Sequence, residues 1–214
     1  MTADQAHTDY LRFFRSWVAN PLTVAAVAPS GLSLSRLMTA GISSAHGPIL
    51  ELCAGTGVFT QALLDRGVAE RNITLIECDP DFVGLLQSRF PQARVLQIDA
   101  SRLAGQAIFH DANIGAVVSG LPLLSMPPRK VMRILSGAFS YIRPKGAFYQ
   151  FTYGPQCPIP RKILDRLGLK AVRIGGTVRN LPPAAVYRIT RRRSLKSLPT
   201  LSTWPPTNPS RQQV

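Results

Sequence analysis

Residues 49–59, Ile-Leu-Glu-Leu-Cys-Ala-Gly-Thr-Gly-Val-Phe, carry the most information about the fold of this chain. An apolar run with an acidic residue at Glu51 passes through small residues and then enters an amphipathic run, which predicts a strand, a tight turn and a helix. Gly55 and Gly57 let the backbone approach a ligand closely, and the N–H groups at the helix start are free to bind polar groups. Many nucleotide-binding folds share such turns, so the stretch alone does not identify the ligand.

Two further apolar runs end in carboxylates. Residues 73–76 lead into Glu77, and residues 94–98 lead into Asp99 and Ala100. Their spacing is typical of βαβ units, and the carboxyl ends of parallel strands meet at one edge of a sheet. The sequence therefore predicts one polar crevice lined by three acidic strand ends. Glu77 or Asp99 taken alone is equally well explained as a solvated strand end. The three acidic strand ends together favour a binding site.

This constellation resembles the class I S-adenosylmethionine-dependent methyltransferases. The resemblance implies that Glu51 lies near the sulfonium and methionine end of S-adenosylmethionine, while Gly55 and Gly57 shape the cofactor loop. It also implies that Glu77 holds the ribose hydroxyls. Asp99 and the backbone at Ala100 would face the adenine amino group. The expected fold is α/β and Rossmann-like, with a mostly parallel seven-stranded sheet, an antiparallel last strand and an added N-terminal amphipathic helix.

The loop departs from the family pattern at its first position, where a glycine is usual and this chain has Cys53. Cysteine is small, so we expect a tolerated variation; a shifted loop is the alternative. The three cysteines show neither metal-ligand spacing nor a disulfide framework, so no metal site is predicted and a reducing cytosol is expected. No signal peptide is recognised, and no apolar run approaches the roughly 20 residues that span a bilayer.

The charge of the chain is strongly positive and unevenly placed. The net charge is +14, and all eleven acidic residues fall between Asp4 and Asp165. Ten basic residues follow with no acid among them, including the run Arg191 to Arg193. Such an excess predicts an anionic partner, either nucleic acid or an acidic membrane face. A basic tail that only aids solubility is the plainer reading.

Three segments are expected: an N-terminal helical cap and membrane-interaction segment at 1–42, the methyltransferase domain at 43–193, and a disordered tail rich in proline and basic residues at 194–214. Ser30 follows Pro29 as the predicted N-cap of a helix over 29–41, and is also a candidate cofactor contact. The elements expected further along are strands near 48–53, 73–78, 94–99, 114–119, 146–153, 169–178 and 184–191, and helices near 57–66, 81–89, 101–107, 128–141 and 160–167.

The loop after the fourth expected strand bears on the substrate. In methyltransferases this position borders the transferable methyl group, and enzymes acting on base amino groups commonly place Asn-x-Pro-aromatic or Asp-Pro-Pro-Tyr there. Here the polar residue is Ser119, also a candidate cofactor contact, and the stacking position is Leu123. The loop therefore argues against a nucleobase as the substrate. The alternative is that it is a simple turn whose course is fixed by Pro122.

The first helix, predicted over 9–19, is amphipathic. Its apolar arc of about 160° faces away from Arg12 and Arg15. Such a helix suits a membrane interface, although packing on the protein's own core is an equally good reading. The members of the arc are Tyr10, Leu11, Phe13, Phe14, Trp17 and Val18.

Over residues 10–190 the chain is similar to the rhizobial-type bacterial phospholipid N-methyltransferases, which are themselves similar to ribosomal RNA adenine dimethylases. The motifs that carry the likeness are Phe14-Arg15-Ser16-Trp17, Val27-Ala28-Pro29-Ser30-Gly31, Glu51 to Gly57, Asp79-Pro80-Asp81-Phe82, Leu121-Pro122-Leu123, Gln150-Phe151-Thr152-Tyr153-Gly154 and Asn180-Leu181-Pro182-Pro183-Ala184.

The resemblance implies stepwise methylation of phosphatidylethanolamine, through mono- and dimethyl intermediates, to phosphatidylcholine. The expected partners are these lipids and an anionic membrane surface on the cytoplasmic face, with no nucleic acid and a monomeric protein. No histidine sits in a recognised motif, so Tyr153 and Tyr10 are the catalytic candidates; a satisfied core hydroxyl is the alternative for Tyr153. Competing hypotheses are an RNA adenine N6-dimethyltransferase and a non-catalytic membrane-binding module with a decayed cofactor site.

Overall fold

The computed structural model of the 214-residue chain describes residues 29–106, 108–109, 113–154, 156–177 and 183–192. The predicted helix over 9–19 with Tyr10, and the tail from residue 194, lie outside the described residues. The strands are β1 (Ile49–Leu52), β2 (Ile73–Glu77), β3 (Arg94–Gln97), β4 (Ile114–Ser119), β5 (Ile142–Tyr153), β6 (Leu169–Thr177) and β7 (Ala184–Arg191). The α-helices are α3 (Pro29–Met38), α4 (Val58–Leu64), α5 (Pro80–Arg89), α6 (Pro128–Tyr141) and α7 (Arg161–Arg166). Short 3-10 turns are η1 (Ser44–His46), η2 (Glu70–Asn72), η3 (Ala100–Arg102) and η4 (Leu123–Ser125).

The strands form one seven-stranded sheet in the order β3-β2-β1-β4-β5-β7-β6. Strands β1 to β5 pair in parallel, and β7 runs antiparallel to both β5 and β6. The chain builds outward from β1 to β3 and then returns to place β4 on the other side of β1, so a topological switch point lies between β1 and β4. Ligands of open α/β sheets bind at the carboxyl edge of such a point. The Rossmann-like α/β fold predicted from the sequence is confirmed.

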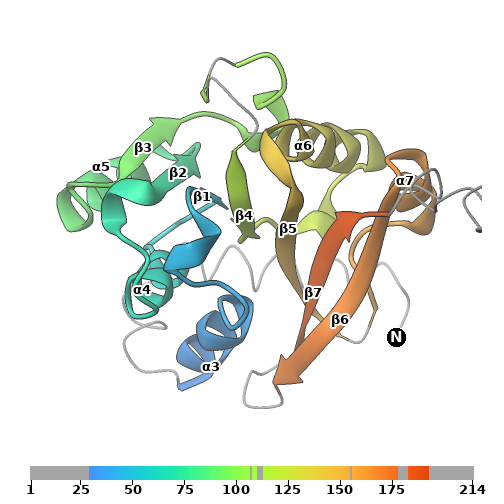
Figure 1. The fold of residues 1–214 in the computed structure, drawn as a ribbon, viewed down its shortest axis with the longest axis horizontal. Coiled ribbons are helices and arrows are strands. Elements are labelled where there is room, and N and C mark those ends of the chain that lie inside the picture. The colour runs from blue at the N-terminus through green and yellow to red at the C-terminus, as the bar shows by residue number, and fades with distance from the viewer. Residues whose placement is uncertain (1–28, 107, 110–112, 155, 178–182, 193–214) are drawn as a thin grey trace, which may run out of the picture.

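Helices cover both faces of the sheet (Figure 1). On one face α3, α4 and α5 bury side chains against the sheet, and on the other face α6 and α7 do so. Every residue of β1, β2 and β4 is buried, because these central strands are covered on both sides. The edge strand β3 is only partly buried.

Two elements differ from the sequence prediction. Strand β5 begins at Ile142 rather than near residue 146, with a register shift against β4 between Ile114 and Ala116. Pro144 lies in this first part of the strand, where the interrupted ladder tolerates a residue that lacks an N–H. The helix predicted over 101–107 is only the turn η3, capped by the Asp99 side chain.

Helix α3 is fastened to the domain at its carboxyl end. The guanidinium of Arg66, which follows α4, donates to the Thr39 hydroxyl at 2.9 Å and to the carbonyls of Arg36 at 3.0 Å and Ala40 at 3.4 Å. Leu34 and Met38 are buried in the same cluster as α4 and α5. The helix that precedes β1 is therefore held firmly on the sheet.

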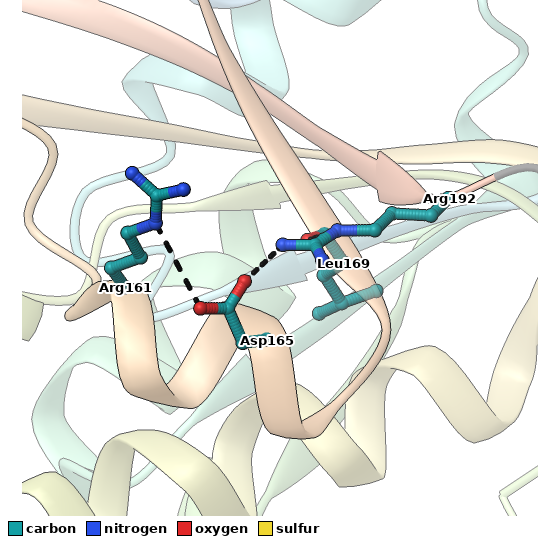
Figure 2. A network of polar contacts seen from close by, with 4 residues as sticks. All are labelled: Arg161, Asp165, Leu169 and Arg192. Carbon is teal, nitrogen blue, oxygen red and sulfur yellow. Dashed lines mark hydrogen bonds and ion pairs between the residues drawn. The ribbon is translucent and has the colours of Figure 1, made fainter.

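Two residues of the basic run near the carboxyl end are engaged inside the protein. Arg191 donates to the carbonyls of Ile142 at 3.0 Å, Arg143 at 3.2 Å and Phe139, at the carboxyl end of α6. Arg192 forms an ion pair with Asp165 of α7 and donates to the carbonyl of Leu169 at 2.9 Å (Figure 2). The carboxylate of Asp165 also lies 3.8 Å from the guanidinium of Arg161. These guanidinium groups hold helix ends to the sheet.

Arg191→Ala is therefore expected to lower folding stability by about 2–3 kcal/mol, because it leaves helix-terminal carbonyls without a charged donor. Urea unfolding followed by circular dichroism measures this loss. Arg188→Ala, which removes an exposed guanidinium on the same strand, is the matched control and should change stability by less than about 0.5 kcal/mol. Equal losses in the two variants would contradict a structural role for Arg191.

Candidate functional site

Glu51 is a buried carboxyl group at the carboxyl end of β1. The hydroxyl of Thr60, on α4, donates to its Oε2 at 2.7 Å. Its Oε1 is also buried and has no hydrogen-bond partner within the part of the chain that the structure describes. Burial raises the pKa of Glu51 from 4.5 to about 8, opposed by the Thr60 hydrogen bond and reinforced by nearby Glu77. An unpaired buried acceptor of this kind fits a cationic or N–H-bearing ligand group.

The loop after β1 turns through three left-handed residues. Cys53 has φ 57°, Gly55 φ 55° and Gly57 φ 79°. The first value explains why glycine is usual at this position: a residue with a Cβ is strained there, by roughly 1–2 kcal/mol. Cys53 keeps the loop in place, with its N–H bonded to the carbonyl of Ile76 at 2.8 Å. Burial raises the pKa of the Cys53 thiol, so the group is neutral.

The two glycines of the loop are needed for different reasons. A Cβ on Gly55 would meet no atom within 4 Å, whereas a Cβ on Gly57 would lie 2.3 Å from the ring of Phe90, the residue that follows the neighbouring helix α5. Gly57 therefore allows the start of α4 to pack on α5. Gly55 leaves a space beside the backbone that a ligand can occupy.

Glu77, at the end of β2, anchors this loop. Its Oε2 accepts from the N–H of Gly55 at 2.9 Å, and its Oε1 accepts from the N–H groups of Cys78 at 2.8 Å and Asp79 at 3.1 Å. The side chain is buried. Because Oε1 is already satisfied, Oε2 is the atom with a lone pair left for a hydroxyl ligand.

Asp99, after β3, is less free than its sequence position indicates. Its Oδ1 accepts from the N–H of Ser101 at 2.8 Å, and its Oδ2 pairs with the Lys130 ammonium of α6 at 3.0 Å. Burial acts to raise the pKa of Asp99, but these N–H donors outweigh it and the pKa lies below its ordinary value. Ala100 is buried at the start of η3. An adenine amino group would share Asp99 with Lys130.

The loop after β4 is pressed against the loop after β1. The N–H of Gly120 donates to the carbonyl of Leu52 at 2.8 Å, and a Cβ on Gly120 would lie 2.6 Å from the carbonyl oxygen of Cys53. Ser119 is buried, and its hydroxyl accepts from the N–H of Leu121 at 3.3 Å. The two loops therefore form one unit at the switch point.

The side chain at the predicted stacking position turns inward. Leu123 is 1% exposed and packs in the apolar cluster beneath α6. Gln150 of β5 donates its amide N–H groups to the carbonyls of Leu121 at 2.9 Å and Phe151 at 2.9 Å. The contact with Leu121 ties the loop to β5.

Tyr153 ends β5 and is half-buried. Its ring packs edge-on to Phe151, at 5.5 Å between centroids, and Phe151 in turn contacts Phe59 of α4 at 6.0 Å. This row of rings lies on the α4 face of the sheet, the face that also holds Glu51.

The structure brings Glu51, Gly55 and Glu77 together at the ends of β1 and β2. Asp99 lies beyond them at the sheet edge, and Ser119 lies at the end of β4 in register with Leu52. Tyr10 lies outside the described residues, as does the side chain of Ser30, whose backbone is in the first turn of α3. Thr60, Lys130 and Gln150 were not predicted as site residues. Gln150 belongs to one of the motifs that carry the family resemblance, whereas the contacts of Thr60 and Lys130 are evident only from the fold.

The two loop glycines give a paired prediction. Gly55→Ala is expected to weaken cofactor binding at least tenfold with a stability loss of only about 1 kcal/mol, because its Cβ enters open space in a left-handed residue. Gly57→Ala is expected to cost about 3 kcal/mol or more of stability, since its Cβ meets Phe90. Calorimetric titration with S-adenosylhomocysteine and thermal unfolding separate the two effects. If the same variant showed the larger loss in both cofactor affinity and stability, the separate roles assigned to Gly55 and Gly57 would be contradicted.

Comparisons with known proteins agree with this geometry. Residues 49–146 match a family described as a methyltransferase domain. The chain is 29% identical over 186 residues to an ornithine lipid N-methyltransferase of Singulisphaera acidiphila, covering 84% of this chain and 94% of that protein.

Solved structures share the fold. One is the 1,6-didemethyltoxoflavin-N1-methyltransferase of Burkholderia thailandensis with bound S-adenosylhomocysteine, with a TM-score of 0.59 and 16% identity over 89% of this chain and 92% of that one. A TehB-like S-adenosylmethionine-dependent methyltransferase of Corynebacterium glutamicum has a TM-score of 0.59 and 17% identity over 88% of this chain and 100% of that one.

Residues 49–146 match a methyltransferase domain, and the fold is shared with enzymes that depend on S-adenosylmethionine. The residues fit this cofactor, because an unpaired buried carboxyl oxygen at Glu51 and an open backbone at Gly55 lie at the switch point. One of the chain's relatives is the ornithine lipid N-methyltransferase, which is named for the methylation of a lipid. No helix of the described residues has the length and apolar character needed to cross a bilayer.

Proposed function

We propose that this enzyme methylates the amino group of a membrane lipid, and that the lipid is phosphatidylethanolamine, converted through its mono- and dimethyl derivatives to phosphatidylcholine. S-adenosylmethionine supplies the methyl group from its sulfonium. In this proposal Glu51, Gly55 and Glu77 bind the cofactor, with Asp99, Ala100, Ser30 and Ser119 at its periphery. The protein works as a monomer on the cytoplasmic face of the membrane, with the segment before residue 43 as its membrane-binding cap.

The observation that carries the proposal is the inward position of Leu123. Enzymes that methylate base amino groups commonly place an aromatic ring at this position, on which the base stacks. Here the corresponding side chain is aliphatic and buried, and the neighbouring Ser119 hydroxyl accepts a hydrogen bond from the N–H of Leu121. This arrangement supports an alkyl amine and disfavours the RNA adenine dimethylase hypothesis.

The chemistry requires a neutral amine. An alkyl amine resembles lysine, whose pKa in water is about 10, so a neutral nitrogen must be favoured in the site. Tyr153 is the residue proposed to face this nitrogen, as a proton acceptor or through its ring once the nitrogen carries a fixed positive charge. The apolar row of Phe59, Phe151 and Tyr153 favours the neutral amine by excluding water.

The test is methyl transfer from radiolabelled S-adenosylmethionine to three substrates: vesicles containing phosphatidylethanolamine, vesicles containing ornithine lipid, and purified ribosomal RNA. Label in phosphatidylethanolamine, with mono-, di- and trimethylated products resolved by mass spectrometry, is the expected result. Label in RNA with none in either lipid would overturn the proposal. Tyr153→Phe should reduce the rate at saturating cofactor while leaving the affinity for S-adenosylhomocysteine unchanged.

Ornithine lipid is the second candidate substrate, because a protein related over most of this chain is named for its methylation. Phosphatidylethanolamine and ornithine lipid both present a primary amine on an acylated molecule. The amine belongs to a phosphate-linked headgroup in the first lipid and to an amino acid in the second. Labelling of ornithine lipid alone would assign the enzyme to that substrate and retain the lipid N-methyltransferase activity.

A further inference from the structure

The last strand of the sheet, β6, has an unusually exposed apolar surface. Val172 is 53% exposed and Ile174 is 38% exposed, and few other large apolar side chains of the described residues are as open to solvent. Strand β6 is an edge strand, with a register shift between Arg173 and Gly175 that leaves Ile174 outside the regular ladder. Neither side chain contributes to the two apolar cores.

Cationic side chains flank these apolar tips. Lys170 on β6 and Arg188 on β7, directly opposite Val172, are exposed on the face of the sheet that carries Val172, and Arg173, which is paired with Tyr187, is exposed on the other face of this edge strand. None of the three side chains makes a hydrogen bond or ion pair within the described ranges, in contrast to Arg191 and Arg192. No acidic residue occurs after Asp165.

The topology places this surface close to the crevice. Strands β5 and β6 both run antiparallel to β7, so their carboxyl ends lie at the same edge of the sheet, and the arrowhead of β6 lies beside α3 in Figure 1. Thr177 and Tyr153 pair with the same residue, Ala184, and the row of Val172 and Arg188 continues to Tyr149. The exposed tips therefore stand a few residues from the edge that holds the candidate catalytic tyrosine.

We propose that the β6 surface, made of Lys170, Val172, Arg173, Ile174 and Arg188, docks on an anionic phospholipid bilayer. Aliphatic tips that enter the headgroup layer and cations that meet lipid phosphates are the chemistry of an interfacial site. An added β-strand from a protein partner fits less well, because a bulge and flanking cations oppose edge pairing. RNA would use the cations but gain nothing from Val172 and Ile174. The inference rests on the proposed lipid substrate, for which it supplies the docking orientation.

The experiment compares the wild-type chain with two variants in flotation assays on phosphatidylglycerol vesicles and phosphatidylcholine vesicles. Lys170→Gln/Arg173→Gln/Arg188→Gln should bind phosphatidylglycerol about 100-fold more weakly at low salt, at about a fivefold factor for each charge. Val172→Thr/Ile174→Thr keeps β-branched residues in the strand and should bind about tenfold more weakly at any salt concentration. The matched charge control is Arg71→Gln/Arg133→Gln/Lys145→Gln, which removes three exposed cations from other surfaces and should change binding by less than threefold.

Thermal unfolding of each variant confirms that it is folded, and methyl transfer to a soluble short-chain phosphatidylethanolamine should stay at the wild-type rate. Wild-type vesicle binding by both β6 variants would overturn the inference. So would sedimentation showing that the wild-type chain self-associates and that the β6 substitutions abolish this association while leaving vesicle binding intact. Failure of the soluble substrate to be methylated by the wild-type chain would count against the proposed function and leave the vesicle result standing.

Discussion

Glu77→Ala is expected to lower cofactor affinity and folding stability together. The carboxylate accepts three backbone N–H groups, from Gly55, Cys78 and Asp79, and each charge-assisted bond contributes roughly 1.5–3 kcal/mol. Since these bonds are not additive, we expect a stability loss of about 3–5 kcal/mol. The loss of one further bond to a ribose hydroxyl, and of the loop geometry, should weaken binding of S-adenosylhomocysteine at least 100-fold.

Glu70 offers the matched control for this experiment. Its carboxylate also accepts two backbone N–H groups, from Gln92 and Ala93, but it lies in η2 before β2, at the opposite edge of the sheet from the crevice. Glu70→Ala should lower the melting temperature and leave cofactor affinity within about twofold of wild type. Calorimetric titration of both variants below their melting temperatures decides the matter; equal affinities in the two would remove Glu77 from the site.

Glu51→Gln is expected to change how stability depends on pH. In the unfolded chain the carboxyl loses its proton near pH 4.5, whereas in the folded protein it keeps the proton until about pH 8. Between these values the folded state binds more protons, so the free energy of unfolding falls as pH rises and then levels off. Burying the ionised carboxylate costs about 3–5 kcal/mol at pH 9 by this linkage. The neutral amide of the variant removes that cost.

The measurement is urea unfolding at pH 5 and pH 9 in the absence of cofactor. The variant should match the wild type at pH 5 and exceed it in stability at pH 9, although it binds S-adenosylmethionine poorly. Thr60→Val is the companion variant. Removing the hydroxyl that donates to Glu51 should raise the pKa of Glu51, so the free energy of unfolding should go on falling to a higher pH than in the wild type. An identical pH profile in Glu51→Gln and wild type would contradict the protonated carboxyl.

The same carboxyl predicts a proton release on binding. If a cationic group of the cofactor meets Oε1, Glu51 ionises, and at pH 7 close to one proton leaves for each molecule bound. Titration calorimetry in buffers of different ionisation enthalpy counts this proton. Glu51→Gln, at cofactor concentrations that still saturate it, should release none.

The fold was readily predicted from the sequence, because its strongest signals are local. Strand β4 and helix α6 begin and end where the apolar pattern places them, since a fully buried strand and an amphipathic helix leave unambiguous periods. The start of β5 was missed because Pro144 reads as a break, and only the interrupted pairing with β4 lets it lie in a strand.

The site was predicted less completely, because partners distant in sequence decide it. The acidic strand ends were found from their positions, but nothing near Asp99 in sequence announces Lys130, 31 residues away. Likewise Glu77 was expected to face a ribose, whereas most of its capacity holds the loop. The basic run near the carboxyl end was expected to meet an anionic partner, yet Arg191 and Arg192 bind carbonyls and a carboxylate that other elements bring to them.

The contact between Gly120 and Cys53 has a consequence for the engineering of this enzyme. A side chain at position 120 would strike the carbonyl oxygen of residue 53, so the loop proposed to face the substrate and the loop proposed to face the methyl donor cannot be exchanged separately. A graft that imports a new substrate loop from another methyltransferase must bring the matching first loop with it. A chimera that carries only one of the two is expected to lose affinity for the donor before it acquires a new acceptor.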